Sequence, residues 1–468
     1  MGKKIFFATI IIGTILLVSS LMLFMNNQSK DNGLSYGPFL THELYDIDFL
    51  TSNETKYYFS TSGNDNNDGL SEDTPIKSFR SLWNFDIQAG DMILLHAGDI
   101  FTENLYFEWS GTAEQPIIIS AYTNDETDSQ NKPIIQGDHS EYGGIMISGG
   151  YIRVSNLEVR GWISGIDLLN SSSKTNISNN YITDNIMGIS VGSNNHYIGY
   201  NTIAENQVMM PETTGDNDDF GAQGILLSGN YNEVAYNYIA NNIADSVDYI
   251  TDGSAIEVYE ASHNIIHHNY ATGNDVFTEL GQQSENLLTV NNTFYKNVII
   301  NEYHYAIMVQ HCTSKFGPVY ETRMYSNIFV HDTEGQDYHA PIVDLVDPEN
   351  PFPARDYFYV SGNVFFSSFH PIGNYENMEP YLEYYNISNG FLTNNTYYVN
   401  TMKAHLKYID PHITCLFQSC QSIVGNNVYD ERASFEGFNL YQTLTPSFIF
   451  EKNAFQIFFE KYFQNSIS

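Results

Sequence analysis

The sequence is poor in charged residues and especially poor in cations. Charged residues make up 16% of the 468, and 19 Lys and Arg stand against 55 Asp and Glu, which gives a net charge of −36. Such a surface repels nucleic acid and anionic lipid. We therefore expect no nucleic-acid partner. An acidic surface suits neutral ligands, or anionic ligands that a divalent cation bridges to the protein. The alternative is that the acidic residues only form the solvated surface of an extracellular protein.

Cysteine is also scarce, and several common catalytic motifs are missing. The three cysteines are Cys312, Cys415 and Cys420, and no pair of them has zinc-finger spacing. Cys415 and Cys420 either close a small loop disulfide outside the cytoplasm or are two free thiols. The sequence has no phosphate-binding loop, dinucleotide fingerprint, HExxH zinc helix or nucleophile elbow, so the chemistries that depend on them are not expected.

One long hydrophobic run stands at the N-terminus, from Ile5 to Met25, and lysines precede it. About 20 apolar residues span a bilayer as a helix, and preceding lysines favour a cytoplasmic N-terminus. We expect residues 1–25 to be an uncleaved signal anchor, with the bulk of the chain outside the cytoplasm at the cell membrane. The alternative is a cleaved signal peptide and a secreted protein. Residues 26–54 are polar and irregular, which is typical of a linker.

From about residue 150 a short phrase recurs: apolar, two variable residues, Asn, one variable residue, apolar. Its alternation is that of a strand, and the intervals of 21–36 residues match one coil of a solenoid of short strands and turns. An Asn at a tight bend tolerates a left-handed backbone, and Asn side chains stacked on successive coils form a ladder. The copies lie at Asn180, Asn201, Asn237, Asn269, Asn297, Asn327, Asn363, Asn395 and Asn427, with a looser one at Asn156.

A second phrase, Gly-Ile-x-Val or a close variant, precedes the Asn phrase, so each coil has at least two strands. The residue between the two apolar positions points outward, because side chains alternate across a strand. These outward residues are Met146, Asp167, Ser190, Leu226, Glu257 and Met308, and the coil before Met308 supplies Glu279.

Residues 57–137 carry a third set of motifs. They include Tyr57-Tyr58-Phe59-Ser60, Thr74-Pro75, Gly90-Asp91, Gly98-Asp99, Ser110-Gly111-Thr112 and Pro133-Ile134-Ile135. In these motifs the segment resembles the N-terminal part of secreted right-handed parallel β-helix proteins of the polysaccharide lyase and glycoside hydrolase, or pectate-lyase-like, type. That group often has a basic residue just before the second Gly-Asp, which is absent here. The resemblance implies an extracellular polysaccharide substrate and does not decide between lyase and hydrolase.

Together these features predict an all-β protein, a right-handed parallel β-helix of about ten or more coils with an N-terminal transmembrane helix and a C-terminal cap. We expect residues 55–140 to form the N-terminal cap and first coils, and residues 141–430 to form the repeats. The aromatic tail, residues 431–468, would cover the open edge of the last coil.

The candidate site centres on Glu257 and Glu279. Adjacent parallel strands lie roughly 4.8 Å apart, so we expect these two side chains to stack as neighbouring outward carboxyl groups, unless the register slips by one and turns Glu279 inward. The insertions before Glu257, around residues 211–219 and 245–252, enter its strand from one side. They are predicted to wall a groove there.

Three interpretations compete for this cluster. The first is a hydrolase without a cofactor, in which Glu257 with Glu279 suits a retaining mechanism, or Asp252 with Glu279 an inverting one. The second is a lyase or epimerase in which Asp216, Asp218 and Asp219, with Glu257, bind Ca²⁺. Because cations are scarce, His267 or Tyr249 would then be the base.

The third interpretation is a non-catalytic glycan-binding or surface scaffold protein, in which the acids form a solvated rim and the histidines cap turns. Under every interpretation exposed aromatic side chains can stack on sugar rings. The predicted substrate-binding residues are Tyr249, Tyr259, His263 and His304, and Trp162 is a further exposed aromatic candidate.

Overall fold

The computed structural model describes residues 54–331 with short gaps, and separate strands beyond them. The gaps are 124–130, 211–218, 283–287, 301, 305–306 and 313–318. The described residues belong to the unit Ser52–Ala454. The predicted membrane segment, the linker, the C-terminal cap, Cys415 and Cys420 lie outside the described residues. Within the described part of the chain, no helix is long and apolar enough to cross a membrane.

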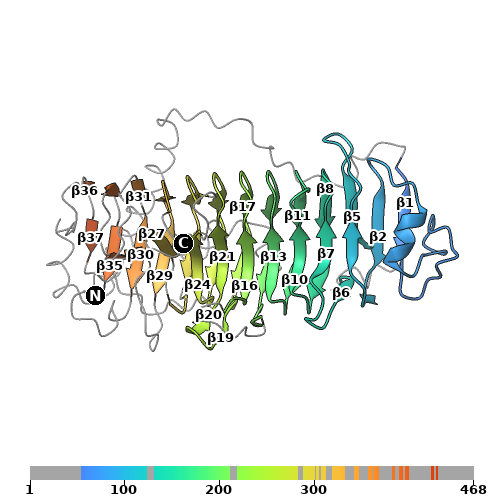
Figure 1. Ribbon diagram of the computed structural model, residues 1–468, viewed down its shortest axis with the longest axis horizontal. Helices are drawn as coiled ribbons and strands as arrows, with labels where there is room; N and C mark the ends of the chain where they lie inside the picture. The colour runs from blue at the N-terminus through green and yellow to red at the C-terminus, as the bar shows by residue number, and fades with distance from the viewer. Residues whose placement is uncertain are drawn as a thin grey trace, which may run out of the picture. The chain divides into compact units, whose positions relative to one another are not determined.

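Three parallel sheets form the body of the protein, and each coil contributes one strand to each sheet in turn (Figure 1). Sheet 1 contains β1 (Lys56–Phe59), β2 (Met92–His96), β5 (Ile117–Tyr122), β8 (Ile152–Ser155), β11 (Asn176–Ser178), β14 (Tyr197–Gly199), β17 (Glu233–Ala235), β22 (Ile265–His267), β25 (Thr293–Tyr295), β28 (Arg323–Tyr325), β31 (Tyr357–Ser361), β34 (Asn389–Thr393) and β36 (Ile423–Gly425).

Sheet 2 contains β3 (Ile100–Phe101), β6 (Ile134–Gln136), β9 (Glu158–Arg160), β12 (Tyr181–Thr183), β15 (Thr202–Ala204), β18 (Tyr238–Ala240), β23 (Tyr270–Thr272), β26 (Val298–Ile300), β29 (Ile328–His331), β32 (Val364–Ser367), β35 (Thr396–Val399) and β37 (Val428–Asp430). Sheet 3 contains β4 (Leu105–Phe107), β7 (Gly143–Ile147), β10 (Ser164–Leu168), β13 (Met187–Val191), β16 (Gln223–Leu227), β21 (Ser254–Tyr259), β24 (Val276–Gly281), β27 (Ile307–Cys312), β30 (Ile342–Val346) and β33 (Leu382–Tyr384).

This arrangement is a parallel β-helix, and its sheets of 13, 12 and 10 strands agree with the expected number of coils. Each coil has three strands, one more than the minimum expected, because the Asn phrase itself bends. Its first apolar residue lies in sheet 1, as Ile177 does in β11, and its last lies in sheet 2, as Ile182 does in β12. The Gly-Ile-x-Val phrase supplies the strand of sheet 3.

The predicted Asn column is confirmed at the corner between sheets 1 and 2. The backbone N–H of Asn180 donates to Asn201 Oδ1 at 3.0 Å, and that of Asn201 donates to Asn237 Oδ1 at 3.0 Å. The ladder continues in the same way through Asn269, Asn297, Asn327 and Asn363. Every buried side chain in it is hydrogen-bonded, which is the condition for placing amides inside a protein.

Two details of this column differ from the prediction. The left-handed residue is the one before each ladder Asn, such as Tyr200 (φ 59°) and Tyr236 (φ 61°), and not the Asn itself. For the same reason the looser copy is wrong by one residue. Asn156 has the left-handed backbone (φ 62°), and Leu157 takes the ladder position, donating its N–H to Asn180 Oδ1. Asn395 and Asn427 lie outside the described residues.

The other two corners carry ladders that the sequence analysis missed. Between sheets 2 and 3 the ladder comprises Asn185, Asn206, Asn242, Asn274 and the buried Glu302. Between sheets 3 and 1 it comprises His196, Asn232, Asn264 and Asn292. In the coils from Asn180 to Glu302, all three corners therefore carry stacked polar side chains.

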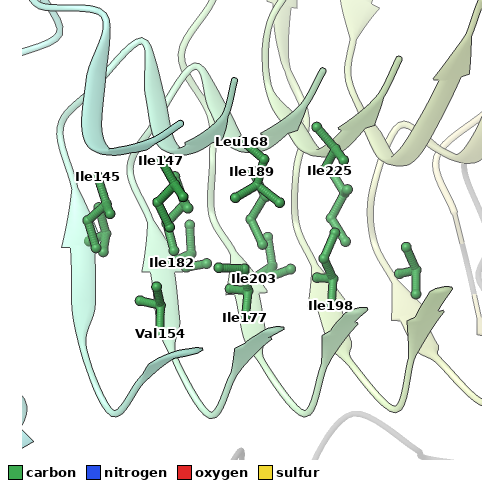
Figure 2. Packing of buried hydrophobic residues seen from close by; sticks show 14 of the residues in the cluster. Ile145, Ile147, Val154, Leu168, Ile177, Ile182, Ile189, Ile198, Ile203 and Ile225 are labelled. Atoms are coloured by element: carbon green, nitrogen blue, oxygen red, sulfur yellow. The ribbon is translucent and has the colours of Figure 1, made fainter. Parts of the chain in front are cut away.

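Aliphatic side chains in register fill the space between the sheets (Figure 2). Ile166 pairs with Ile189, and Ile189 with Ile225, all three fully buried. Trp162 also lies in this core, which makes its expected place on the surface wrong. It stands at the corner position next to Asn185, whose side chain accepts its backbone N–H, and its indole N–H donates to the Ile135 carbonyl at 3.1 Å.

Candidate active site

The outward positions of sheet 3 form one column. The register pairs Asp167 with Ser190, Leu226 with Glu257, and Glu257 with Glu279. The predicted stacking of the two glutamates on neighbouring strands is therefore confirmed. The column runs Tyr106, Met146, Asp167, Ser190, Leu226, Glu257 and Glu279, and the backbone register pairs Glu279 with Met308 of the next strand.

Buried neighbours anchor the strands beneath both glutamates. Ile256 and Val258 flank Glu257 and have no exposed surface, whereas Glu257 itself stays partly exposed. Glu279 lies in the same way between the buried Thr278 and Leu280. The alternation that buries the apolar residues therefore presents both carboxyl groups on the outer face.

A tyrosine and a glutamine hold the carboxyl groups. The Tyr259 hydroxyl donates to Glu279 Oε1 at 2.6 Å, and Gln223 Nε2 donates to Glu257 Oε2. Gly281, which pairs with Tyr259, leaves room for this ring, because a Cβ there would lie 2.6 Å from Tyr259 Cζ. Tyr259, predicted to bind substrate, thus contacts a glutamate directly, whereas nothing in the sequence pointed to Gln223.

Asp252 is the third acid of the site. Burial, followed by the charge of Glu279, raises its pKa to about 7, and its Oδ1 accepts the Gly253 N–H at 2.7 Å. Burial, followed by the charges of Glu279 and Asp252, raises the pKa of Glu257 well above its usual range. Both shifts favour the protonated forms of Asp252 and Glu257, and three acids share one region of the surface.

A short hairpin stands beside the acids, as the insertion before Glu257 predicted. β19 (Ala244–Ser246) and β20 (Ile250–Asp252) pair in antiparallel fashion and project beyond the ends of β16 and β21 (Figure 1). Tyr249 in its turn is 40% exposed. Burial, followed by the charges of Asp252, Asp248 and Glu279, raises the pKa of Tyr249 to about 12, which places its ring close to the acids.

Asp219 stabilises the turn of this hairpin. Its Oδ2 accepts hydrogen bonds from Ser246 Oγ at 2.9 Å, Val247 N at 2.7 Å and Asp248 N at 3.1 Å, and such bonds lower its pKa. Asp216 and Asp218, its predicted partners in binding Ca²⁺, lie outside the described residues. Among the residues that are described, no group of three or more His, Cys, Asp or Glu has the arrangement of a metal site.

Of the predicted histidines, only His304 lies near the acids. Its Nδ1 is 3.0 Å from Asp275 Oδ2, and Asp275 Oδ1 accepts the Thr251 hydroxyl at 2.7 Å. The charge of Asp275 also contributes to the raised pKa of Asp252. His304 and Asp275 therefore extend the polar region toward the next coil.

The structure does not bring His267 and His263 to the carboxyl pair. His267 lies in β22 of sheet 1, where its Nε2 is 2.9 Å from Glu233 Oε1. His263 lies in the turn between sheets 3 and 1, and its ring stacks on Tyr231 with 4.8 Å between ring centroids. Both residues are held in contacts of the scaffold, so the base role considered for His267 has no geometric support.

Comparison with known proteins agrees with this architecture. No family model matches the sequence. A curated relative, a lacto-N-biosidase of Bifidobacterium longum subsp. longum, is 32% identical over 136 residues, 23% of this chain and 8% of that protein's length. The solved GH136 lacto-N-biosidase of Eubacterium ramulus has a TM-score of 0.50 at 16% identity, covering 80% of this chain and 67% of that one.

Polysaccharide lyases are also among the similar structures. An alginate lyase from Paenibacillus sp. str. FPU-7 has a TM-score of 0.47 at 16% identity, covering 69% of this chain and 96% of that one. The pectate lyase Pel9A has a TM-score of 0.48 at 14% identity, with coverages of 70% and 84%. The likeness to the GH136 structure shows the fold of this chain, a parallel β-helix. The fold implied by the resemblance found in the sequence is therefore confirmed.

Proposed function

We propose that this chain hydrolyses a neutral glycan at the outer face of sheet 3. Glu257 is the proton donor, and Glu279 is the carboxylate that attacks the sugar or activates water. The observation that carries the proposal is the register of β21 and β24, which pairs these two residues on adjacent strands.

The surroundings of the two glutamates support these roles. Burial and neighbouring charge raise the pKa of Glu257, which favours the protonated form that a general acid requires. The hydrogen bond from Tyr259 favours the ionised form of Glu279, as a nucleophile or base requires. Adjacent strands are roughly 4.8 Å apart, close to the carboxyl spacing of retaining glycosidases, roughly 5–5.5 Å. Asp252 with Glu279 is the alternative pair for an inverting mechanism.

The calcium-dependent lyase remains the alternative chemistry, with less support. Of the three aspartates predicted to bind Ca²⁺, the structure describes Asp219. Its Oδ2 already accepts hydrogen bonds from three donors of the hairpin. Between residues 145 and 300 the sequence offers few cations to act as the base: Arg153, Arg160, Lys174 and Lys296. Anchoring at the cell membrane also stays a prediction, which fractionation of cells expressing the full chain would test.

The test of the hydrolase proposal is turnover of a panel of neutral glycans that includes a lacto-N-bioside. We expect the full chain to release reducing sugar from at least one of them, and Glu257→Gln to lower the rate by about 10² to 10⁴. The control is Glu141→Gln, which makes the same change at an exposed glutamate just before β7, where its carboxylate accepts a hydrogen bond from Asn104.

Three outcomes would contradict the proposal. Equal rates for Glu257→Gln and Glu141→Gln would remove Glu257 from catalysis. Unsaturated products that absorb in the ultraviolet and disappear on chelation would establish the lyase. Binding without turnover across the panel would favour the glycan-binding scaffold.

A further inference from the structure

A second group of exposed aromatic side chains lies on sheet 3, far from the acids along the same column. Tyr106 occupies the outward position of β4 and is 36% exposed. Trp83, from the 3-10 helix η2 (Phe79–Asn84), is 53% exposed and stacks on Tyr106, with 6.2 Å between ring centroids and 14° between ring planes. The two rings together present flat aromatic surface to solvent.

The scaffold holds these rings in place. Leu105 and Phe107 anchor β4 in the core, and the Tyr106 hydroxyl lies 3.2 Å from Ser148 Oγ. Trp109 packs against the core, and the centroid of its ring lies 5.0 Å from the centroid of the Trp83 ring. A rigid amphipathic ring pair offers large contact area with little loss of side-chain entropy on binding, which favours a ligand with a flat apolar face and polar edges.

The pair is aligned with the carboxyl groups. Five strand spacings of roughly 4.8 Å separate β4 from β21, about 24 Å along the column. Between them, just before β7, stands Tyr142, which is 52% exposed. The outward residues from Tyr106 to Glu279 include two glutamates and Asp167 and no cation, so the face suits an uncharged chain.

We propose that Trp83 and Tyr106 form a remote sugar-binding platform for a neutral polysaccharide that lies across sheet 3 and reaches Glu257 and Glu279. The inference takes only its class of ligand from the proposed function. It specifies the substrate as a chain of several sugar rings, since a disaccharide at the acids cannot touch the platform.

The test is affinity electrophoresis of the full chain carrying Glu257→Gln, in gels containing soluble β-glucan, arabinoxylan, galactomannan or galactan. We expect at least one polymer to retard this protein. Adding Trp83→Ala or Tyr106→Ala should weaken the retardation about tenfold, in line with the loss of one aromatic contact. The matched control is Tyr231→Ala. Tyr231 is 52% exposed and stacks on His263, which lies in the turn between sheets 3 and 1 and outside the platform.

The outcomes separate this inference from the hydrolase proposal. Equal retardation of the Trp83→Ala, Tyr106→Ala and Tyr231→Ala proteins, or no retardation in any gel, overturns the platform even if Glu257 is catalytic. Retardation that depends on Trp83 supports the platform even if no glycan is cleaved. Circular dichroism of each variant establishes that its fold is intact.

Discussion

Glu257 and Glu279 differ in what their side chains contact. Glu279 accepts a hydrogen bond from Tyr259, whereas Glu257 is surrounded by buried surface and by other acids. The proposed mechanism thus gives one residue type two roles, according to its environment. Asp252, with a pKa of about 7, adds a charge that appears only as the pH rises through neutrality.

Removing that charge has a predictable effect on the pH dependence of hydrolysis. Negative charge at Asp252 raises the pKa of Glu257, so Asp252→Asn lowers it, and Glu257 loses its proton at a lower pH. We expect the alkaline limb of the kcat/KM profile to move to lower pH. Asp245→Asn, the same change at an exposed position of the hairpin, is the control. A limb that stays in place, or that moves equally in both variants, would contradict this account.

Outward placement could be predicted wherever a residue lies inside a strand. Glu257 and Glu279 follow from the alternation of side chains and from a coil of minimal length between them. The rule ends at the corners, where the chain turns. Trp162 lies at such a corner, and its place was therefore predicted wrongly. The contact between Gln223 and Glu257 could not be predicted either, because Gln223 lies at the end of a strand in a different coil.

At the scale of elements, each coil is fixed by its three corners. One Asn ladder was predictable because each Asn is followed two residues later by the buried, mostly apolar residue at the centre of the next strand, as Asn180 is by Ile182. The ladder through Asn185 and Asn206 lies five residues after the first, and its last member is Glu302. The third lies five residues before the same Asn, at His196, Asn232, Asn264 and Asn292, and its residue type changes from His196 to Asn232. Both spacings could have been read from the sequence, and they were missed because the search for repeats followed the apolar residues that flank the first Asn.

The first ladder predicts a large loss of stability when one member is removed. Asn237 Oδ1 accepts the backbone N–H of Asn201, and its amide donates to the carbonyls of Ile198 and Ala235. Asn237→Ala leaves these buried groups unpaired, so we expect the free energy of unfolding to fall by about 3 kcal/mol in urea titrations. Asn170→Ala, at an exposed position, should change it by less than about 0.5 kcal/mol. An equal fall in the free energy of unfolding of the Asn237→Ala and Asn170→Ala proteins would contradict the stabilising role of the ladder.

At the scale of the whole β-helix, stacking turns spacing in the sequence into a continuous surface. Residues from successive coils become neighbours on sheet 3, and the β19–β20 hairpin marks the part of that face where the acids gather. The net charge of −36 adds long-range repulsion of anionic polymers. The site is therefore a segment of an extended face, which suits a chain-like ligand better than a small molecule.

The measurement that tests the central claim most directly is the anomeric configuration of the first product, followed by proton NMR during hydrolysis. Carboxyl groups on adjacent strands are spaced for a covalent intermediate, so we expect retention of configuration. Inversion would require a wider separation, roughly 6.5–9.5 Å, and would contradict the pairing of Glu257 with Glu279 as the catalytic unit.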